Sequence, residues 1–259
     1  MWQDVKMLNA LSGLLSVLAA FALLCAGLWW LGQRPMFTLK AIQVEGVPDV
    51  PLRRVNALTI RAGAVPRIKG NFFTADLNVV RNAFESVPWV RKAMVRREWP
   101  NRLIVTLEEH RTLGTWGEDG SLLSIKGDVF TANLAEAEED GALLAFAGPS
   151  GSEKDVAARY QEFKDWFAAL SLKPETVQLS SRYAWTVKMD SGMTVELGRE
   201  QDKNTLRERA ARLIAVYPQL LSRLNGKIEN VDMRYPNGMA LKASGLTLAG
   251  LAGKQDKAK

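Results

Sequence analysis

The clearest candidates for chemistry in this chain are three consecutive residues, Glu108, Glu109 and His110. Paired carboxylates, or a carboxylate beside an imidazole, can serve general acid–base catalysis. These residues follow an alternating apolar run that predicts a β-strand, and neighbouring side chains on a strand point to opposite faces. Glu108 and Glu109 therefore cannot form a catalytic pair, and we interpret His110 as a surface or boundary residue.

No other sequence pattern indicates an enzyme. Glycine-rich phosphate loops, HExxH, GxSxG and SxxK motifs are absent. The single histidine and the single cysteine, Cys25, cannot supply the usual ligands of a metal site, so we predict no metal, no cofactor and no small-molecule substrate. Five tryptophans lie in apolar stripes or at strand ends, and we assign them to core packing: Trp89, Trp99, Trp116, Trp166 and Trp185.

An uncharged apolar stretch over residues 10–31 predicts a single N-terminal transmembrane helix. About 22 residues at 1.5 Å each make a helix of about 33 Å, which is enough to cross a hydrocarbon core of about 30 Å. Trp29 and Trp30 lie at its far end, where amphipathic rings favour the headgroup layer. A cleaved signal peptide is the competing interpretation, but it requires a shorter apolar core and a small-x-small cleavage site.

The orientation of this helix is set by domain size more than by charge. Lys6 lies on the short side, and Arg34 and Lys40 flank the other end. The positive-inside rule therefore favours neither orientation strongly. Long domains translocate largely regardless of their charge. We therefore expect residues 1–9 to form a cytoplasmic tail and the large C-terminal part to lie outside.

The composition after the span is that of a folded protein. Charged residues make up 24% and hydrophobic residues 47% of the chain, and the net charge is +6. Arginines and lysines are spread without a dense run, so we interpret them as solvated surface charge and predict no nucleic-acid binding. The only cysteine lies in the span, so the exported part has no disulfide.

A first domain is predicted over residues 37–109. Its elements follow the order β-α-α-β-β: a strand over 37–45, a helix from Pro51 to Gly63, a helix from Ala75 to Pro88, and strands over 91–99 and 103–107. A three-stranded sheet with two helices on one face buries these apolar residues economically.

Residues 111–244 predict a second, strand-rich domain. It contains hairpins over 113–125, 183–197 and 228–243, a strand over 177–180, a helix opened by a Ser152–Asp155 capping box, a helix around 206–217 interrupted at Pro218, and a solvated acidic linker over 136–140. The final strand has one neighbour in sequence, so we expect it at a sheet edge. Residues 245–259 are predicted to be a flexible C-terminal tail.

Several stretches resemble a known family. PWV at 88–90, continuing through VRREWPNRL at 95–103 to Glu109, is similar to a motif of the FtsQ/DivIB family of bacterial cell-division proteins. Phe72-Phe73 match its paired phenylalanines, and VDMRYPNG at 231–238 is similar to its last hairpin. The resemblance implies an α+β fold with a single N-terminal transmembrane helix, then a POTRA domain (β-α-α-β-β) and a β domain with helices on one face.

The resemblance also implies a function. Proteins of this family are non-enzymatic scaffolds of the inner membrane at the division septum, with a cytoplasmic N-terminus and a periplasmic bulk. They link early septal-ring proteins to FtsB and FtsL, and through them to septal peptidoglycan synthesis. The POTRA domain serves placement at the division site, for which Val95 and Arg97 are candidates, and this domain and the transmembrane segment are expected to contact other divisome proteins.

The last strand of the family's β domain accepts a segment of FtsB. A sheet edge suits this role because it offers unpaired N–H and C=O groups to an incoming strand. Arginine can grip a partner carboxylate at two points, and tyrosine supplies contact area at low entropic cost. The candidate partner-binding residues are Arg182, Arg234, Tyr235, Asn237, Gly238, Met239, Ala240, Leu241 and Lys242.

Two other functions remain open from the sequence. One is a different membrane-anchored POTRA protein that acts in export or envelope assembly, against which the single POTRA domain beside the anchor argues. The other is a membrane-anchored wall enzyme, which would need an acid–base pair in a cleft or a metal site. We favour the scaffold.

Overall fold

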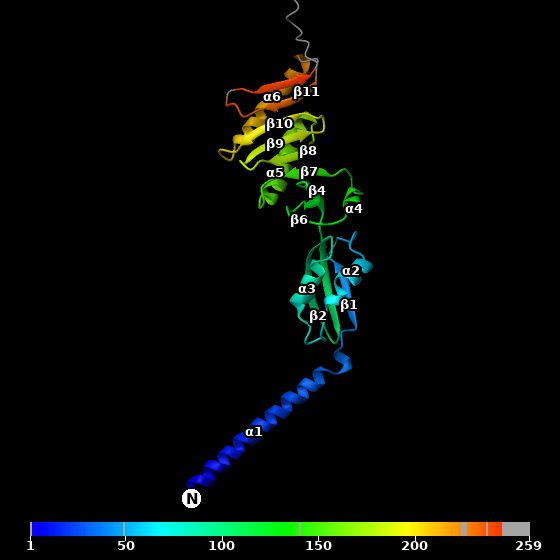
Figure 1. Cartoon of the computed structure of the whole chain (residues 1–259), viewed down its shortest axis with the longest axis vertical. Coiled ribbons are helices and arrows are strands. Elements are labelled where there is room, and N and C mark those ends of the chain that lie inside the picture. The colour runs from blue at the N-terminus through cyan, green and yellow to red at the C-terminus, as the bar shows by residue number, and fades with distance from the viewer. Residues whose placement is uncertain (1, 49, 140, 224–226, 237, 245–259) are drawn as a thin grey trace, which may run out of the picture. The chain divides into compact units, whose positions relative to one another are not determined.

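The structure is a computed structural model that describes residues 2–48, 50–139, 141–223, 227–236 and 238–244. The chain divides into two compact units, Met1–Glu109 and His110–Lys259. The elements of both units are labelled in Figure 1. The predicted fold class is confirmed: an apolar N-terminal helix precedes a POTRA domain and a strand-rich β domain with helices. The predicted tail over 245–259 and the candidate Asn237 lie outside the described residues.

The N-terminal helix α1 runs from Trp2 to Gly32. Its segment Met7–Gly32 is long and apolar enough to cross a membrane, and none of that segment is buried in the protein. The predicted span over 10–31 lies inside this segment, and residues 2–9 continue the same helix. The helix fits single-pass membrane anchoring.

The POTRA domain contains a three-stranded sheet in the order β1-β3-β2. Strand β3 (Arg102–Glu109) is central, parallel to β1 (Ala41–Gly46) and antiparallel to β2 (Val90–Glu98). Helices α2 (Ala57–Gly63) and α3 (Leu77–Glu85) complete the domain, with short 3₁₀ turns at Pro35–Phe37 and Val65–Arg67. The alternating side chains of β3 and the apolar sides of the helices form the core: Ile60, Val80, Phe84, Leu103, Val105 and Leu107.

Two predicted boundaries in this domain are wrong. The first helix does not open at Pro51 but at Ala57, because Asn56 provides the cap: its Oδ1 accepts from the N–H groups of Leu58 and Thr59 at 2.9 and 3.0 Å. The first strand begins at Ala41 and not at Phe37, which ends a 3₁₀ turn and is buried. The Asn56 cap therefore sets the start of the helix, and the 3₁₀ turn over Pro35–Phe37 precedes the strand.

The β domain is built on a nine-stranded mixed sheet in the order β12-β11-β10-β9-β8-β7-β4-β5-β6. The strands are β4 (Thr112–Trp116), β5 (Ser121–Ser124), β6 (Val129–Phe130), β7 (Leu144–Ala147), β8 (Pro174–Leu179), β9 (Ala184–Met189), β10 (Thr194–Arg199), β11 (Lys227–Asp232) and β12 (Ala240–Ser244). Strand β6 pairs with β5 and forms one end of this order; β12 pairs with β11 and forms the other.

Helices α5 (Glu153–Phe167) and α6 (Thr205–Arg223) pack against this sheet and share one apolar core with it. On β8 and β9 the core residues recur at every second position, so they lie on one face of the sheet. The core joins residues from both helices and from β8 to β11, including Phe163, Phe167, Val177, Val187, Leu197, Leu213 and Val231.

Four sequence predictions for this domain need correction. Helix α6 runs through Pro218 without interruption, because Leu213, Tyr217 and Leu220 on both sides of it pack into the same core. Ser152 precedes α5 but forms no capping box: its hydroxyl donates to the carbonyl of Pro149 at 2.6 Å. The acidic stretch contains a short helix, α4 (Leu134–Glu138), and strand β7 was not predicted.

The assignment of all five tryptophans to the core is also wrong in one case. Trp89 and Trp185 are buried, and Trp116 and Trp166 pack against the core, but Trp99 is 72% exposed. Trp99 lies in the turn between β2 and β3, beyond Glu98 and Arg102, the last residue pair of the hairpin.

Candidate partner-binding edge

Strand β12 is the outermost strand of the sheet. It runs antiparallel to β11, with Leu241 opposite Val231 and Ala240 opposite Asp232. Within the described ranges, no further strand pairs with its outer side. On an outermost strand, alternate N–H and C=O groups face away from the sheet, which is the geometry that strand addition uses.

The side chains of β12 differ between its two faces. Leu241, opposite the fully buried Val231, lies on the core side but remains 37% exposed. Lys242 lies on the other face and pairs with Glu229 across the strands, Nζ to Oε2 at 3.3 Å. Hydrogen bonds from Ser244 and then Lys242 lower the pKa of the Glu229 carboxyl. Strand β12 is thus held in register by β11, while Leu241 on its core-side face is only partly covered.

Arg234 follows β11 and is paired within its own chain. Its Nε and Nη2 donate to the two carboxylate oxygens of Asp232 at 2.9 and 2.6 Å, and Nη2 lies 3.3 Å from Glu196 Oε2. The hydrogen bond from Arg234 lowers the pKa of Asp232, and Asp232 in turn raises the pKa of Arg234. Gly198 makes room for this side chain, because a Cβ there would lie 2.7 Å from Arg234 Cγ.

Helix α6 holds the chain on its way from β11 to β12. Arg212 donates to the carbonyl oxygens of Pro236 and, at 3.3 Å, of Tyr235. One turn earlier, Arg209 donates to the carbonyls of Leu197 and Arg199 at the end of β10, at 2.6 and 2.9 Å. Two arginines of one helix thus fix the backbone at the same end of the sheet.

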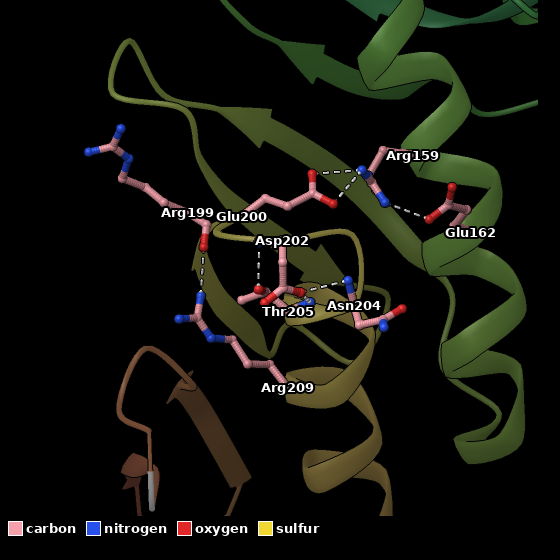
Figure 2. A network of polar contacts seen from close by, with 8 residues as sticks. All are labelled: Arg159, Glu162, Arg199, Glu200, Asp202, Asn204, Thr205 and Arg209. Atoms are coloured by element: carbon pink, nitrogen blue, oxygen red, sulfur yellow. Dashed lines mark hydrogen bonds and ion pairs between the residues drawn. The ribbon is translucent and has the colours of Figure 1, made fainter.

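The N-terminus of α6 is itself fixed by a polar network (Figure 2). Asp202 Oδ1 accepts from the N–H groups of Asn204 and Thr205 at 2.8 and 2.9 Å, and these bonds, with Asn204 the larger contributor, lower the pKa of Asp202. Beside it, Arg159 of α5 binds both carboxylate oxygens of Glu200 at 3.0 and 2.8 Å. These contacts tie α5, the end of β10 and α6 together.

Arg182 lies in the turn between β8 and β9, at the same end of the sheet as Arg234. The register shows this, since Ala184 pairs with Arg199, Glu196 pairs with Asp232, and Asp232 pairs with Ala240. Arg182 is exposed, and the next residue, Tyr183, is 60% exposed with a φ of 59°. Strands β9, β10 and β11 separate this turn from the β12 edge.

The remaining predicted residues fall into two groups. Tyr235 is 55% exposed, Gly238 is exposed and Met239 packs against the core before β12 begins. In the POTRA domain the guanidinium of Arg97 donates to the backbone carbonyls of Phe72 and Ala75 in the same domain, both at 2.7 Å. Val95 is half-buried on β2. Sequence reasoning missed Arg212 and Tyr183; the spacing of Arg209 and Arg212 on one helix is the only signal for the former.

Glu108, Glu109 and His110, which first suggested catalysis, each contact a different partner. Glu108 pairs with Arg91 at 3.1 Å. Glu109 accepts from the backbone N–H groups of residues 53, 54 and 55 at 2.9, 3.0 and 2.7 Å. The ring of His110 stacks on Phe130 at 4.0 Å. In the part of the chain that the structure covers, no group of histidine, cysteine and acidic residues could hold a metal ion.

Comparisons with known proteins agree with this arrangement. Residues 37–110 match the family model for the FtsQ-type POTRA domain, and residues 114–234 match that for the C-terminal part of cell division protein FtsQ/DivIB. The chain belongs to the FtsQ/DivIB family. Cell division protein FtsQ of Burkholderia pseudomallei is 51% identical, covering 95% of this chain and 96% of the relative. That of Bordetella pertussis is 41% identical, over 93% and 92%.

Membership of the FtsQ/DivIB family supports a role in the cell-division machinery and favours it over export or envelope assembly. Cell division protein FtsQ of Neisseria gonorrhoeae, at 29% identity, still covers 93% of this chain and 95% of its own length. The anchor, the POTRA domain and the β domain therefore occur together in these relatives.

Proposed function

We propose that this protein is a non-enzymatic scaffold of the divisome that captures FtsB by strand addition at β12. Through FtsB and FtsL it links early septal-ring proteins to septal peptidoglycan synthesis. It lies in the inner membrane at the septum with its N-terminus in the cytoplasm and its two folded domains in the periplasm. The POTRA domain and the transmembrane helix contribute contacts to other divisome proteins.

One observation supports this proposal above the others: β12 is an edge strand whose register is fixed by β11 and whose approach is fixed by α6. Natural proteins usually blunt such edges, so an edge strand that no other described strand covers is a candidate for partner pairing. Leu241 offers partly covered apolar surface beside the backbone, and Tyr235 and Arg182 offer exposed contact area and charge at one end.

The decisive experiment separates the loss of a backbone N–H group from the loss of a side chain. N–H groups alternate in direction along a strand, so of Leu241→Pro and Lys242→Pro one removes an outward donor and the other an inward one. The proline that removes the outward N–H leaves the pairing with β11 intact, so that variant should keep the wild-type unfolding temperature. We expect this variant to lose FtsB binding by at least about tenfold, equivalent to about 1.4 kcal/mol.

Leu241→Ala and Lys242→Ala are the matched controls, because they remove the same side chains and keep both N–H groups. Binding is measured with the full-length protein in detergent and purified FtsB. If both proline variants bind FtsB as tightly as the alanine variants do, strand addition at β12 is wrong.

A photocrosslinking residue placed at Lys242 tests the same site in cells. The control position is Lys188, which is exposed on β9 in the middle of the sheet. We expect FtsB to be captured from position 242 and not from position 188. Equal capture from both positions would show that FtsB binds a face of the sheet, which would contradict binding at the β12 edge.

A further inference from the structure

The POTRA domain carries exposed apolar side chains at the end where the chain leaves helix α1. Met36 is 55%, Phe73 54% and Trp99 72% exposed. Single exposed apolar residues are ordinary, but these three come from three separate segments of the sequence. Because they lie at the same end of the domain, these three side chains form a candidate contact surface.

Backbone contacts hold the three segments together. The N–H of Lys40 donates to the carbonyl of Asn101 at 3.1 Å, and Asn101 Nδ2 donates to the carbonyl of Met36 at 3.3 Å. The N–H of Phe72 donates to the carbonyl of Phe37 at 2.9 Å, and the rings of Phe37 and Phe73 lie 4.9 Å apart. The turn at Trp99 and the segments at Met36 and Phe73 therefore form one end of the domain.

This end is tied closely to the end of α1. The helix stops at Gly32 and Phe37 is already buried in the POTRA core, so at most about 18 Å of extended chain separates them. Asn71 Nδ2 also donates to the carbonyl of Gly32 at 2.9 Å. Trp29 and Trp30 mark the end of the span, where aromatic rings favour the headgroup layer.

The charges around this end suit a lipid headgroup layer. Arg34, Lys40 and Lys69 are exposed, and the guanidinium of Arg34 lies 3.5 Å from the centre of the Trp30 ring. Basic residues flanking aromatic and aliphatic side chains are the composition of interfacial membrane-binding surfaces.

We propose that the end of the POTRA domain formed by Met36, Phe73 and Trp99 inserts into the headgroup layer of the membrane that α1 spans. The domain then stands on the membrane surface through its own side chains and does not hang from a free linker. This contact uses neither β12 nor FtsB, so its test is independent of the proposed function.

The test is the membrane depth of spin labels on the full-length protein in nanodiscs of phosphatidylcholine and phosphatidylglycerol. Cys25, the only cysteine, reports the span in the unaltered chain. In a Cys25→Ser background, Trp99→Cys and Phe73→Cys report the proposed contact. Leu58→Cys is the matched control: it is 75% exposed and lies at the opposite end of β3, about 25 Å away.

We expect the ratio of oxygen to nickel-complex accessibility at positions 99 and 73 to be several-fold higher than at 58 and lower than at Cys25. Adding Met36→Glu to the label at 99 should lower it toward the value at 58. Equal ratios at 99, 73 and 58 would overturn the proposal, as would an aqueous value at Cys25. Because the nanodiscs contain only lipid and this chain, a raised ratio at 99 and 73 can be assigned to the membrane and not to a protein partner.

Discussion

The guanidinium of Arg234 meets the carboxylate of Asp232 at two points, Nε to Oδ1 at 2.9 Å and Nη2 to Oδ2 at 2.6 Å. The side chain of Asp232 is only 12% exposed, whereas that of Arg234 is 59% exposed. The pair therefore anchors an exposed arginine to a buried acceptor at the end of β11. It fixes the backbone before the chain turns toward β12.

Replacing Asp232 with Asn should destabilise the fold by about 1 kcal/mol near neutral pH, because a partly exposed charged hydrogen bond is lost. The pKa of Asp232 is lowered in the folded chain. Its stabilising contribution is thus fully present above the ordinary aspartate value of about 4 and is lost as the pH falls through the lowered folded-state value.

Thermal unfolding of the wild type and of Asp232→Asn at pH 7 and pH 3 checks this prediction. The gap in unfolding temperature should be clear at pH 7 and smaller at pH 3. A gap of the same size at both pH values would contradict a role for the ionised carboxylate.

Arg212→Ala should weaken FtsB binding severalfold while leaving the unfolding temperature within about 2 °C of wild type, as expected for loss of an exposed contact. The reason is that Arg212 holds the carbonyls of Tyr235 and Pro236, which lead into β12. Calorimetric titration with FtsB measures the effect. Arg207→Ala, exposed on the same helix, is the control, and equal binding by both variants would show that α6 does not position the edge.

Tyr235→Ala and Arg182→Glu should each reduce FtsB capture in a pull-down, with the fold intact. Both side chains are exposed, so their removal leaves no cavity. Reversing the charge at 182 also adds repulsion toward an acidic partner segment. Wild-type capture by either variant would remove that residue from the binding site.

Glu109→Ala should destabilise the POTRA domain by about 2 kcal/mol, because three backbone N–H groups of residues 53–55 lose their acceptor. Glu109→Gln, which keeps one acceptor oxygen, should fall between the alanine variant and the wild type. Denaturant unfolding gives the free energies. Glu98→Gln, whose partner Arg102 lies 3.9 Å away at the surface, is expected to have little effect.

The architecture of the POTRA domain followed from the sequence because its apolar periodicity is strong. Leu103, Val105 and Leu107 recur at every second position and are fully buried on one side of the central strand, and Ile104 between them is also apolar and buried. Strand β7 escaped prediction because its four residues, LAFA, are apolar in either a helix or a strand, and its pairing with β4 and β8 is long-range.

The contacts around β12 were harder to predict than its position. The order of elements suffices to expect an outer strand after the last turn. It does not reveal that Arg234 is bound by Asp232 and Glu196, or that Arg212 reaches the chain more than twenty residues later. Trp99 shows the same limit: the sequence pattern predicts an apolar residue at a strand end to be core, whereas the structure shows this side chain to be exposed.

The two margins of the large sheet are unequal. Strand β6 contributes two residues and is flanked by the stack of His110 on Phe130, whereas β12 extends over five. A sheet with two long open margins would add copies of itself end to end and grow into fibres. The proposed strand addition at β12 therefore predicts that each molecule takes up one partner strand, with a stoichiometry of one to one.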